Sequence, residues 1–258
     1  MIRSGWLTAS VIAALMPAAA AAPRIQSVRV DGTAIVIALD DGRELSRDQL
    51  VGTILTLRGE DGRRQRMKIE AITPDPTDPT GEVLLYRLTA QDAAGVWSPV
   101  CSPGPDGLQM AIPQPGPSGD LAIWCTSGAL GKCVRWGYHP WQRQHDGTSL
   151  APYHRACVNM ARADYCGDDR PTTNEGRLIQ MQDRAGVRTW PSVSRDFAFE
   201  AAWGEQGAVC VARVRVPENI SLAELVRRCP RLAGRTGEAC TAESSSRFGT
   251  PLIFNRSR

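Results

Sequence analysis

Residues 121–166 read LAIWCTSGALGKCVRWGYHPWQRQHDGTSLAPYHRACVNMARADYC and hold most of the rare side chains of this 258-residue chain. The stretch contains every histidine, half of the cysteines and three of the four tyrosines. These residues are His139, His145 and His154; Cys125, Cys133, Cys157 and Cys166; and Tyr138, Tyr153 and Tyr165, with Trp124, Trp136 and Trp141 among them. Large side chains and cysteines crowded into a short span are typical of a crosslinked core or of the wall of a site. The sequence leaves both interpretations open.

The N-terminus predicts export. Arg3 supplies a positive charge, Trp6 to Met16 form a short apolar run, and small residues follow Pro17 as far as Ala22. This is the pattern of a cleaved signal peptide, which we place at residues 1–21. The apolar run is too short to cross a membrane, and no later stretch is longer. We therefore expect a periplasmic or secreted protein whose mature chain has no transmembrane segment.

The charge of the chain argues against nucleic acid as a partner. Removal of the signal peptide takes away Arg3 and no acid, so 30 basic residues become 29 against 27 acidic ones. The two signs are interspersed, and a balance near neutrality produces no strong field. The expected partner is an envelope or extracellular ligand that the sequence does not identify, and the oligomeric state stays open.

The cysteines predict disulfides, because their number is even and the chain is exported. They are Cys101, Cys125, Cys133, Cys157, Cys166, Cys210, Cys229 and Cys240. No Cys-x-x-Cys pair occurs and the other spacings are too wide for a zinc knuckle, so neither a metal nor a cofactor is expected. The sequence does not choose among the possible pairings.

Residues 22–118 are predicted to form a β-rich module, a small sandwich or an open barrel. Alternating apolar residues surround an Asp31-Gly32 turn, which is a strong hairpin signal. A second pair of strands is expected on either side of Gly59 to Gly62, and another strand over 81–90. The proline- and glycine-rich stretch from Pro103 to Gly119 is expected to connect two domains near residue 118. Alternation of apolar residues within it leaves open a strand inside a single fold.

Residues 119–258 predict a disulfide-crosslinked domain of mixed helices and strands, which makes the whole chain α+β. Ser127 is expected to cap a short helix that reaches Trp136, and Ser149 a longer helix that ends near Asp164. Helical periodicity places Cys157 on the buried face of the longer helix. We then expect a strand over 178–182, a hairpin over 197–214, and a helix that begins at a capping box of Ser221 with Glu224 and stops at Pro230.

The segment Ala163-Asp164-Tyr165-Cys166-Gly167 resembles the signature of the ADYC family of exported bacterial proteins. Gly128 to Trp141 and Leu150 to Cys157 resemble two further blocks of that family, and Leu252 to Ser257 is similar to its usual ending. The resemblance covers most of the chain from about Pro99 onward. It implies a secreted, cysteine-rich domain and implies no established activity.

Our first hypothesis is a binding or structural module that performs no chemistry. Aromatic faces and a guanidinium fork can line a cleft for a glycan or a peptide. The residues placed to do so are Arg135, Trp136, Tyr138 and Trp141. Packing of the same aromatic side chains in the core is the alternative.

The second hypothesis is a secreted hydrolase whose site gathers His154, Asp164 and Tyr165, since an imidazole beside a carboxylate can act as a general base. His154 and Asp164 would lie about 15 Å apart on one helix, so the chain would have to fold back. A hydrogen bond from His154 within a packed corner is the favoured interpretation. No nucleophile elbow, zinc-protease helix or dinucleotide motif occurs, and enzymatic activity is left undecided.

A calcium loop is a further alternative, because oxygen ligands cluster after the signature. They are Asp164, Asp168, Asp169, Asn174 and Glu175. Their spacing does not match an EF-hand. A structural turn is favoured instead, in which Asp164 caps backbone amides and Gly167 reverses the chain.

Overall fold

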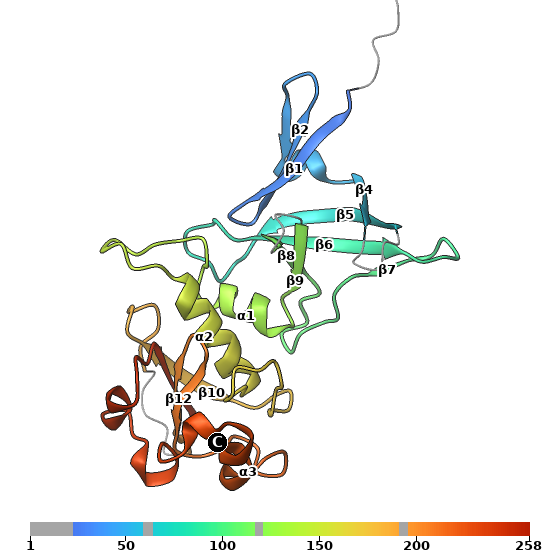
Figure 1. Ribbon diagram of the computed structural model, residues 1–258. Coiled ribbons are helices and arrows are strands. Elements are labelled where there is room, and N and C mark those ends of the chain that lie inside the picture. The colour runs from blue at the N-terminus through green and yellow to red at the C-terminus, as the bar shows by residue number, and fades with distance from the viewer. Residues whose placement is uncertain (1–22, 59–63, 117–120, 191–195) are drawn as a thin grey trace, which may run out of the picture.

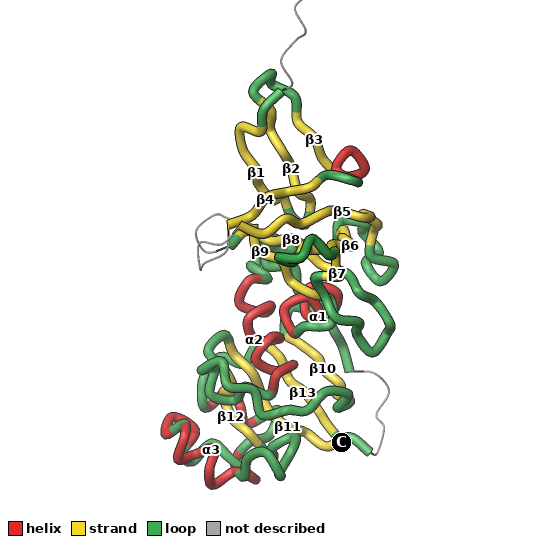
Figure 2. Tube along the Cα trace, turned by 90° about the vertical axis from the view of Figure 1, so that its right-hand side faces the viewer, coloured by secondary structure: helices red, strands yellow, loops and turns green. Residues whose placement is uncertain are grey.

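The computed structural model describes residues 23–58, 64–116, 121–190 and 196–258. Within these ranges the fold is α+β, with three antiparallel sheets, three α-helices and four short 3-10 helices. Figures 1 and 2 show an elongated molecule with strands β1 to β9 at one end, helices α1 and α2 in the middle, and the last sheet with α3 at the other end. The predicted signal peptide lies outside the described residues.

The first sheet has the order β1-β2-β3. Its strands are β1 (Ile25–Asp31), β2 (Ala34–Leu39) and β3 (Glu44–Ser46). The predicted first hairpin is confirmed: Asp31 lies opposite Ala34, and Gly32 in the loop has a φ of 60° that glycine adopts without strain. A 3-10 helix, Arg47–Leu50, leads to the second sheet.

The second sheet has six strands in the order β4-β5-β6-β8-β9, with β7 also paired to β6. They are β4 (Ile54–Arg58), β5 (Arg64–Pro74), β6 (Leu84–Gln91), β7 (Trp97–Pro99), β8 (Ala111–Pro115) and β9 (Leu121–Cys125). The predicted strands of this region are confirmed, and the Gly59 to Gly62 turn lies outside the described residues. Buried side chains of both sheets, among them Ile35 and Ile69, form one core.

Residue 118 lies between β8 and β9, outside the described residues. Strand β9 on its C-terminal side pairs with β8 on its N-terminal side, from Cys125 opposite Ala111 to Leu121 opposite Pro115. The second sheet therefore includes strands from both sides of this position. A domain boundary at residue 118 stays a prediction.

Helices α1 (Ala129–Arg135) and α2 (Ala151–Arg162) each have their N-cap one residue later than predicted. Gly128 is the N-cap of α1 rather than Ser127, because Ser127 belongs to a turn that the Gly128 N–H closes onto the Cys125 carbonyl at 3.0 Å. Leu150 is the N-cap of α2, and the Ser149 hydroxyl just before it accepts a bond from the Ala151 N–H at 3.3 Å.

The third sheet has the order β10-β13-β11-β12. Its strands are β10 (Ile179–Asp183), β11 (Ala198–Gly204), β12 (Gly207–Val211) and β13 (Ile253–Ser257). The predicted hairpin of β11 and β12 is confirmed, with Gly204 opposite Gly207. The last strand of the chain, β13, lies between β10 and β11, a pairing that no sequence pattern predicted.

Helix α3 (Leu222–Arg228) confirms the predicted capping box, since both hydrogen bonds between Ser221 and Glu224 are present. The helix ends before Pro230, as expected. Three 3-10 helices follow on the way to β13: Pro230–Leu232, Gly237–Ala239 and Ser244–Arg247.

The α1–α2 pair connects the two ends of the molecule. Cys157 and Met160 of α2 are fully buried in the core shared with the third sheet, which confirms the predicted buried face. Val134 of α1 is buried on the other side, in a cluster that includes Leu85 and Ile112 of the second sheet.

All eight cysteines form disulfides, as predicted. The pairs are Cys101–Cys125, Cys133–Cys157, Cys166–Cys229 and Cys210–Cys240. Four disulfides in one chain are typical of proteins that work in an oxidising compartment outside the cytoplasm. No helix in the described part of the chain is long and apolar enough to cross a membrane.

Candidate functional site

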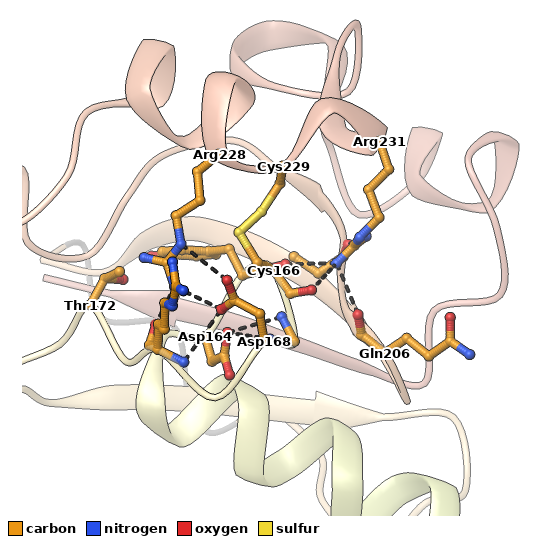
Figure 3. Close-up of a disulfide and its surroundings, with 12 residues drawn as sticks. Asp164, Cys166, Asp168, Thr172, Gln206, Arg228, Cys229 and Arg231 are labelled. Carbon is orange, nitrogen blue, oxygen red and sulfur yellow. Dashed lines mark hydrogen bonds and ion pairs between the residues drawn. A yellow bond between two sulfur atoms is a disulfide. The ribbon is translucent and has the colours of Figure 1, made fainter.

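The signature residues form the turn that follows α2 (Figure 3). Ala163 ends the helix in the left-handed conformation, with a φ of 48°. Asp164 is only 2% exposed, and its Oδ1 accepts bonds from the backbone N–H groups of Gly167 at 2.9 Å and Asp168 at 3.2 Å. The carboxylate therefore caps the turn, as the sequence predicted.

Gly167 permits this turn to lie directly against the β11–β12 hairpin. Its φ is 68°, and a Cβ atom at this position would lie 2.5 Å from the backbone oxygen of Gln206. The neighbouring carbonyls are collected by Arg231, whose guanidinium donates to the oxygens of Tyr165, Cys166, Gln206 and Ala208 at 2.6 to 3.1 Å. The side chain of Arg231, which lies just after α3 in the chain, thus holds the signature and the hairpin together.

The disulfide Cys166–Cys229 connects the signature to the end of α3. Beside it, Arg228 forms an ion pair with Asp168 at 2.7 Å and also donates to the Arg170 carbonyl at 3.0 Å (Figure 3). These contacts and those of Arg231 join three segments of the chain. The arrangement restricts motion of the turn, and the polar groups of the turn form hydrogen bonds and ion pairs within the protein.

Tyr165 is part of a buried polar network. Its ring stacks on Trp203 with centroids 5.1 Å apart, and its hydroxyl donates to Glu200 Oε1 at 3.1 Å and accepts from the Arg215 backbone N–H at 2.8 Å. Glu200 and Arg215 form an ion pair at 2.9 Å, and Asn255 donates to Glu200 at 2.8 Å. Burial is the main cause that raises the pKa of Tyr165 far above its usual value. The phenol therefore stays protonated and acts as a structural hydrogen-bonding group.

His154 lies in a packed corner between α1 and β9. It is 3% exposed, its ring stacks on Trp124 with centroids 5.1 Å apart, and its Nε2 lies 3.1 Å from the Leu130 carbonyl oxygen. Burial lowers the pKa of His154 to about 4, so the imidazole is neutral at physiological pH and donates to that carbonyl.

The structure does not bring His154, Asp164 and Tyr165 together. His154 bonds to a backbone carbonyl of α1, Asp164 bonds to amides of its own turn, and Tyr165 bonds to the Glu200 network. A general base needs a partner within hydrogen-bond reach of a substrate proton. This geometry gives the hydrolase hypothesis no support.

The acidic residues after the signature are engaged with other groups. Asp164 caps the turn, Asp168 pairs with Arg228, and Asp169 pairs with Arg162 at 2.8 Å. In the described part of the chain, no group of three or more histidines, cysteines, aspartates or glutamates is placed to hold a metal ion. The contacts of these three aspartates fit the structural turn that the sequence analysis favoured.

Three of the four predicted binding residues pack within the molecule. Arg135 bonds to Asp75 at 2.8 Å and to Asp106 at 2.6 Å. Tyr138 is fully buried, and its hydroxyl donates to Asp183 at 2.8 Å. Burial, together with the nearby charge of Asp183, raises the pKa of Tyr138 far above the usual range. Trp141 stacks on His139 with centroids 5.1 Å apart and lies against Gly32. These contacts connect α1 and the following loop to neighbouring strands.

Trp136 is different, because its partly buried side chain lines two cavities at the end of α1. We call the first, of about 580 Å³, the α1–α2 cleft; it is lined in part by Lys132, Arg162, Glu175, Arg177, Leu178 and Arg215. The second, of about 500 Å³, is the His139 cleft; it is lined in part by Asp78, Arg135, His139, Arg143, His145 and Arg188. Basic side chains outnumber acidic ones in both.

Several of these cations have no acidic partner. Arg135, Arg162 and Arg215 each pair with a carboxylate, whereas Lys132, Arg177, Arg143 and Arg188 form no ion pair among the described residues. Only Lys132 belongs to the block that the sequence analysis singled out. Arg177 and Arg188 come from a later segment, and Arg143 lies just after the block without a recognisable motif, so sequence reasoning missed all three.

The fold and the clefts define a disulfide-crosslinked α+β protein whose signature is a structural turn and whose two open clefts are both lined by Trp136. The family model of the ADYC domain matches residues 47–217, and the chain belongs to the ADYC domain family. The match begins upstream of Pro99, where the resemblance was expected to start, and includes the three blocks at 128–141, 150–157 and 163–167. The segment 252–257 lies beyond it. Comparison with curated proteins and with solved structures gave no match.

Proposed function

We propose that this protein is a binding module of the periplasm or the extracellular space that holds an anionic glycan or peptide against Trp136. The observation that carries the proposal is the setting of this indole: it lines two clefts that also contain Lys132, Arg143, Arg177 and Arg188, cations without an ion pair in the described part of the chain. The predicted signal peptide and the four disulfides support the location.

The charge around Trp136 favours a negatively charged ligand. Lys132 and Arg177 in the α1–α2 cleft, and Arg143 and Arg188 in the His139 cleft, face two acidic lining residues, Glu175 and Asp78. Asp78 is already engaged by the Val83 N–H at 2.8 Å and by Thr80. Guanidinium groups bind carboxylates and phosphates in a bidentate manner, so arginines without an acidic partner suit such groups. Arg143 and Arg188 each donate one bond to a backbone carbonyl, of Gly147 and Trp136, and have further N–H groups for a ligand.

The indole gives the ligand a second kind of contact. Tryptophan offers a large rigid apolar face at a low cost in conformational entropy, and it is among the residues that most often dominate binding energy. Burial of Leu178, which is 57% exposed in the α1–α2 cleft, would add apolar contact. An anionic ligand with a flat sugar or peptide face fits both features.

The proposal is tested by calorimetric titration of the mature protein with a glutamate hexapeptide, an oligogalacturonate and an uncharged oligosaccharide of similar length. We expect at least one anionic probe to bind and the uncharged one to bind more weakly. Trp136→Ala should weaken binding about 30-fold, which corresponds to about 2 kcal/mol. Trp97→Ala is the matched control, because Trp97 on β7 contacts Arg66 and lines neither cleft.

Charge reversal measures the contribution of the cations to binding separately from that of the indole. A Lys132→Glu/Arg177→Glu variant should lose affinity for the anionic probes and show a weaker dependence on salt. The proposal is wrong if Trp136→Ala binds as tightly as the unmodified protein, or if only the uncharged probe binds. The same probes report hydrolysis, and cleavage lost in His154→Ala would instead restore the hydrolase hypothesis.

A further inference from the structure

The outer face of the third sheet carries a separate cavity, of about 550 Å³, which we call the β13 cleft. Gln182, Phe199 and Arg256 of the sheet line it together with Trp190. The segment 237–243 forms the opposite wall, which the disulfide Cys210–Cys240 attaches to β12. The cavity has the size of a small-molecule site.

This face is the one that does not pack on α2. Along β13, Ile253 belongs to the core shared with α2, and the buried Asn255 bonds to Glu200 within the molecule. Phe254 belongs to a different cluster, with Phe199 and Trp190 packed at its edge. Because side chains alternate along a strand, Arg256 lies on the same outer face as Phe254.

Arg256 has an unused hydrogen-bond donor. Its guanidinium lies 4.2 Å from the centroid of the Trp190 ring, and its Nη1 atom is buried without a hydrogen-bond partner among the described residues. Arg256 is also among the residues that line the β13 cleft, so its guanidinium is accessible to a ligand there. Stacking on an indole uses the face of the guanidinium and leaves the N–H groups in its plane free to bind a carboxylate.

The neighbouring strand β10 carries an unused acceptor. Gln180 is directly opposite Arg256 in the pairing of β10 with β13, and its Oε1 atom is also buried without a partner in the described chain. On the far wall of the cleft, Glu238 and Glu243 add two carboxylates, and apolar surface comes from Ala242 on that wall and from Ala212 next to β12. The cleft thus combines one cation with several acceptors.

We infer that the β13 cleft binds a small zwitterion, an amino acid or a dipeptide with free ends. Its carboxylate bonds to Arg256, and its ammonium group lies toward Glu238. A pure anion is disfavoured because Glu238 and Glu243 repel it, and a pure cation leaves Arg256 unpaired. This site is independent of the clefts around Trp136.

The test is a titration of the ¹⁵N-labelled protein with L-alanyl-L-alanine, followed by the indole N–H signal of Trp190, which Trp190→Phe identifies. The expected result is saturable binding with a dissociation constant in the millimolar range or tighter. Blocking either end of the probe, as the C-terminal amide or the N-acetyl derivative, should weaken binding at least about 10-fold.

Two variants place the ligand. Glu238→Gln, at an exposed position on the rim, should weaken binding of the dipeptide and leave the affinity for the N-acetyl derivative unchanged. Arg256→Lys keeps the charge and should weaken the binding of every probe that has a free carboxylate. Arg227→Lys, on α3, is the control for this variant. An unmoved Trp190 signal, or equal binding of the dipeptide and both blocked forms, would overturn the inference.

Discussion

Removal of the signature hydroxyl, by Tyr165→Phe, is the most direct test that the signature is structural. The substitution keeps the ring stacked on Trp203 and deletes two hydrogen bonds, one to Glu200 at 3.1 Å and one from the Arg215 N–H at 2.8 Å. Glu200 keeps its bonds to Arg215 and Asn255. The Arg215 N–H is left buried without a partner, which costs about 1–3 kcal/mol, and a bond to a charged group is lost as well.

We therefore expect the free energy of unfolding to fall by about 2–4 kcal/mol. In urea, with the disulfides intact, this corresponds to a midpoint lowered by about 1–2 M. Tyr153→Phe is the matched control: Tyr153 packs in the same core, its hydroxyl has no hydrogen bond in the described structure, and the expected change is under about 0.5 kcal/mol. Affinity for an anionic probe should be the same in both variants. A stable Tyr165→Phe protein that has lost binding would refute the structural interpretation.

Three further predictions concern stability. Gly167→Ala should destabilise the protein by about 2 kcal/mol or more in thermal or urea unfolding, because the new Cβ meets the Gln206 backbone; Gly147→Ala, with a φ of 85° and open space around it, should cost only about 1 kcal/mol. His154 has a folded pKa of about 4, below its ordinary value of 6.5, so its contribution is complete above pH 6.5 and is lost as the pH falls toward 4. Between pH 7 and pH 4, the free energy of unfolding should therefore fall by about 3 kcal/mol less in His154→Gln than in the unmodified protein. An equal fall in both proteins would contradict a lowered pKa for His154. Replacement of Cys133 and Cys157 together by serine should lower stability by about 3–4 kcal/mol, and a urea midpoint that does not move would show that the crosslink adds nothing.

The position of the signature explains its residue types. Asp164 is needed as an acceptor for the amides of its own turn, Gly167 for close approach to the hairpin, and Cys166 for the crosslink to α3. Each of these residues therefore helps to hold three segments together. Lys132 and Arg177, which line the α1–α2 cleft, lie outside the segment 163–167, so the proposed binding site and the family signature are different parts of the molecule.

The sequence by itself determined the features that depend on neighbours along the chain. Ser221 and Glu224 lie three residues apart and can cap a helix wherever it packs, and the hairpin signals around Gly32 and 204–207 act through local backbone geometry. The helical period placed Cys157 on the buried face, and the even number of cysteines predicted disulfides. The capping, hairpin and periodicity signals each act within one turn or one helix, and the cysteine count acts through composition alone.

Only the tertiary structure decided which cysteines pair, where β13 inserts and what His154 contacts. Cys166 and Cys229 are 63 residues apart, and β13 reaches β11 from the end of the chain. The cations around Trp136 and the donor of Arg256 likewise depend on segments brought together by packing. Contacts between distant residues leave no periodic pattern in a single sequence, because their geometry follows from the packed core and not from the neighbouring residues.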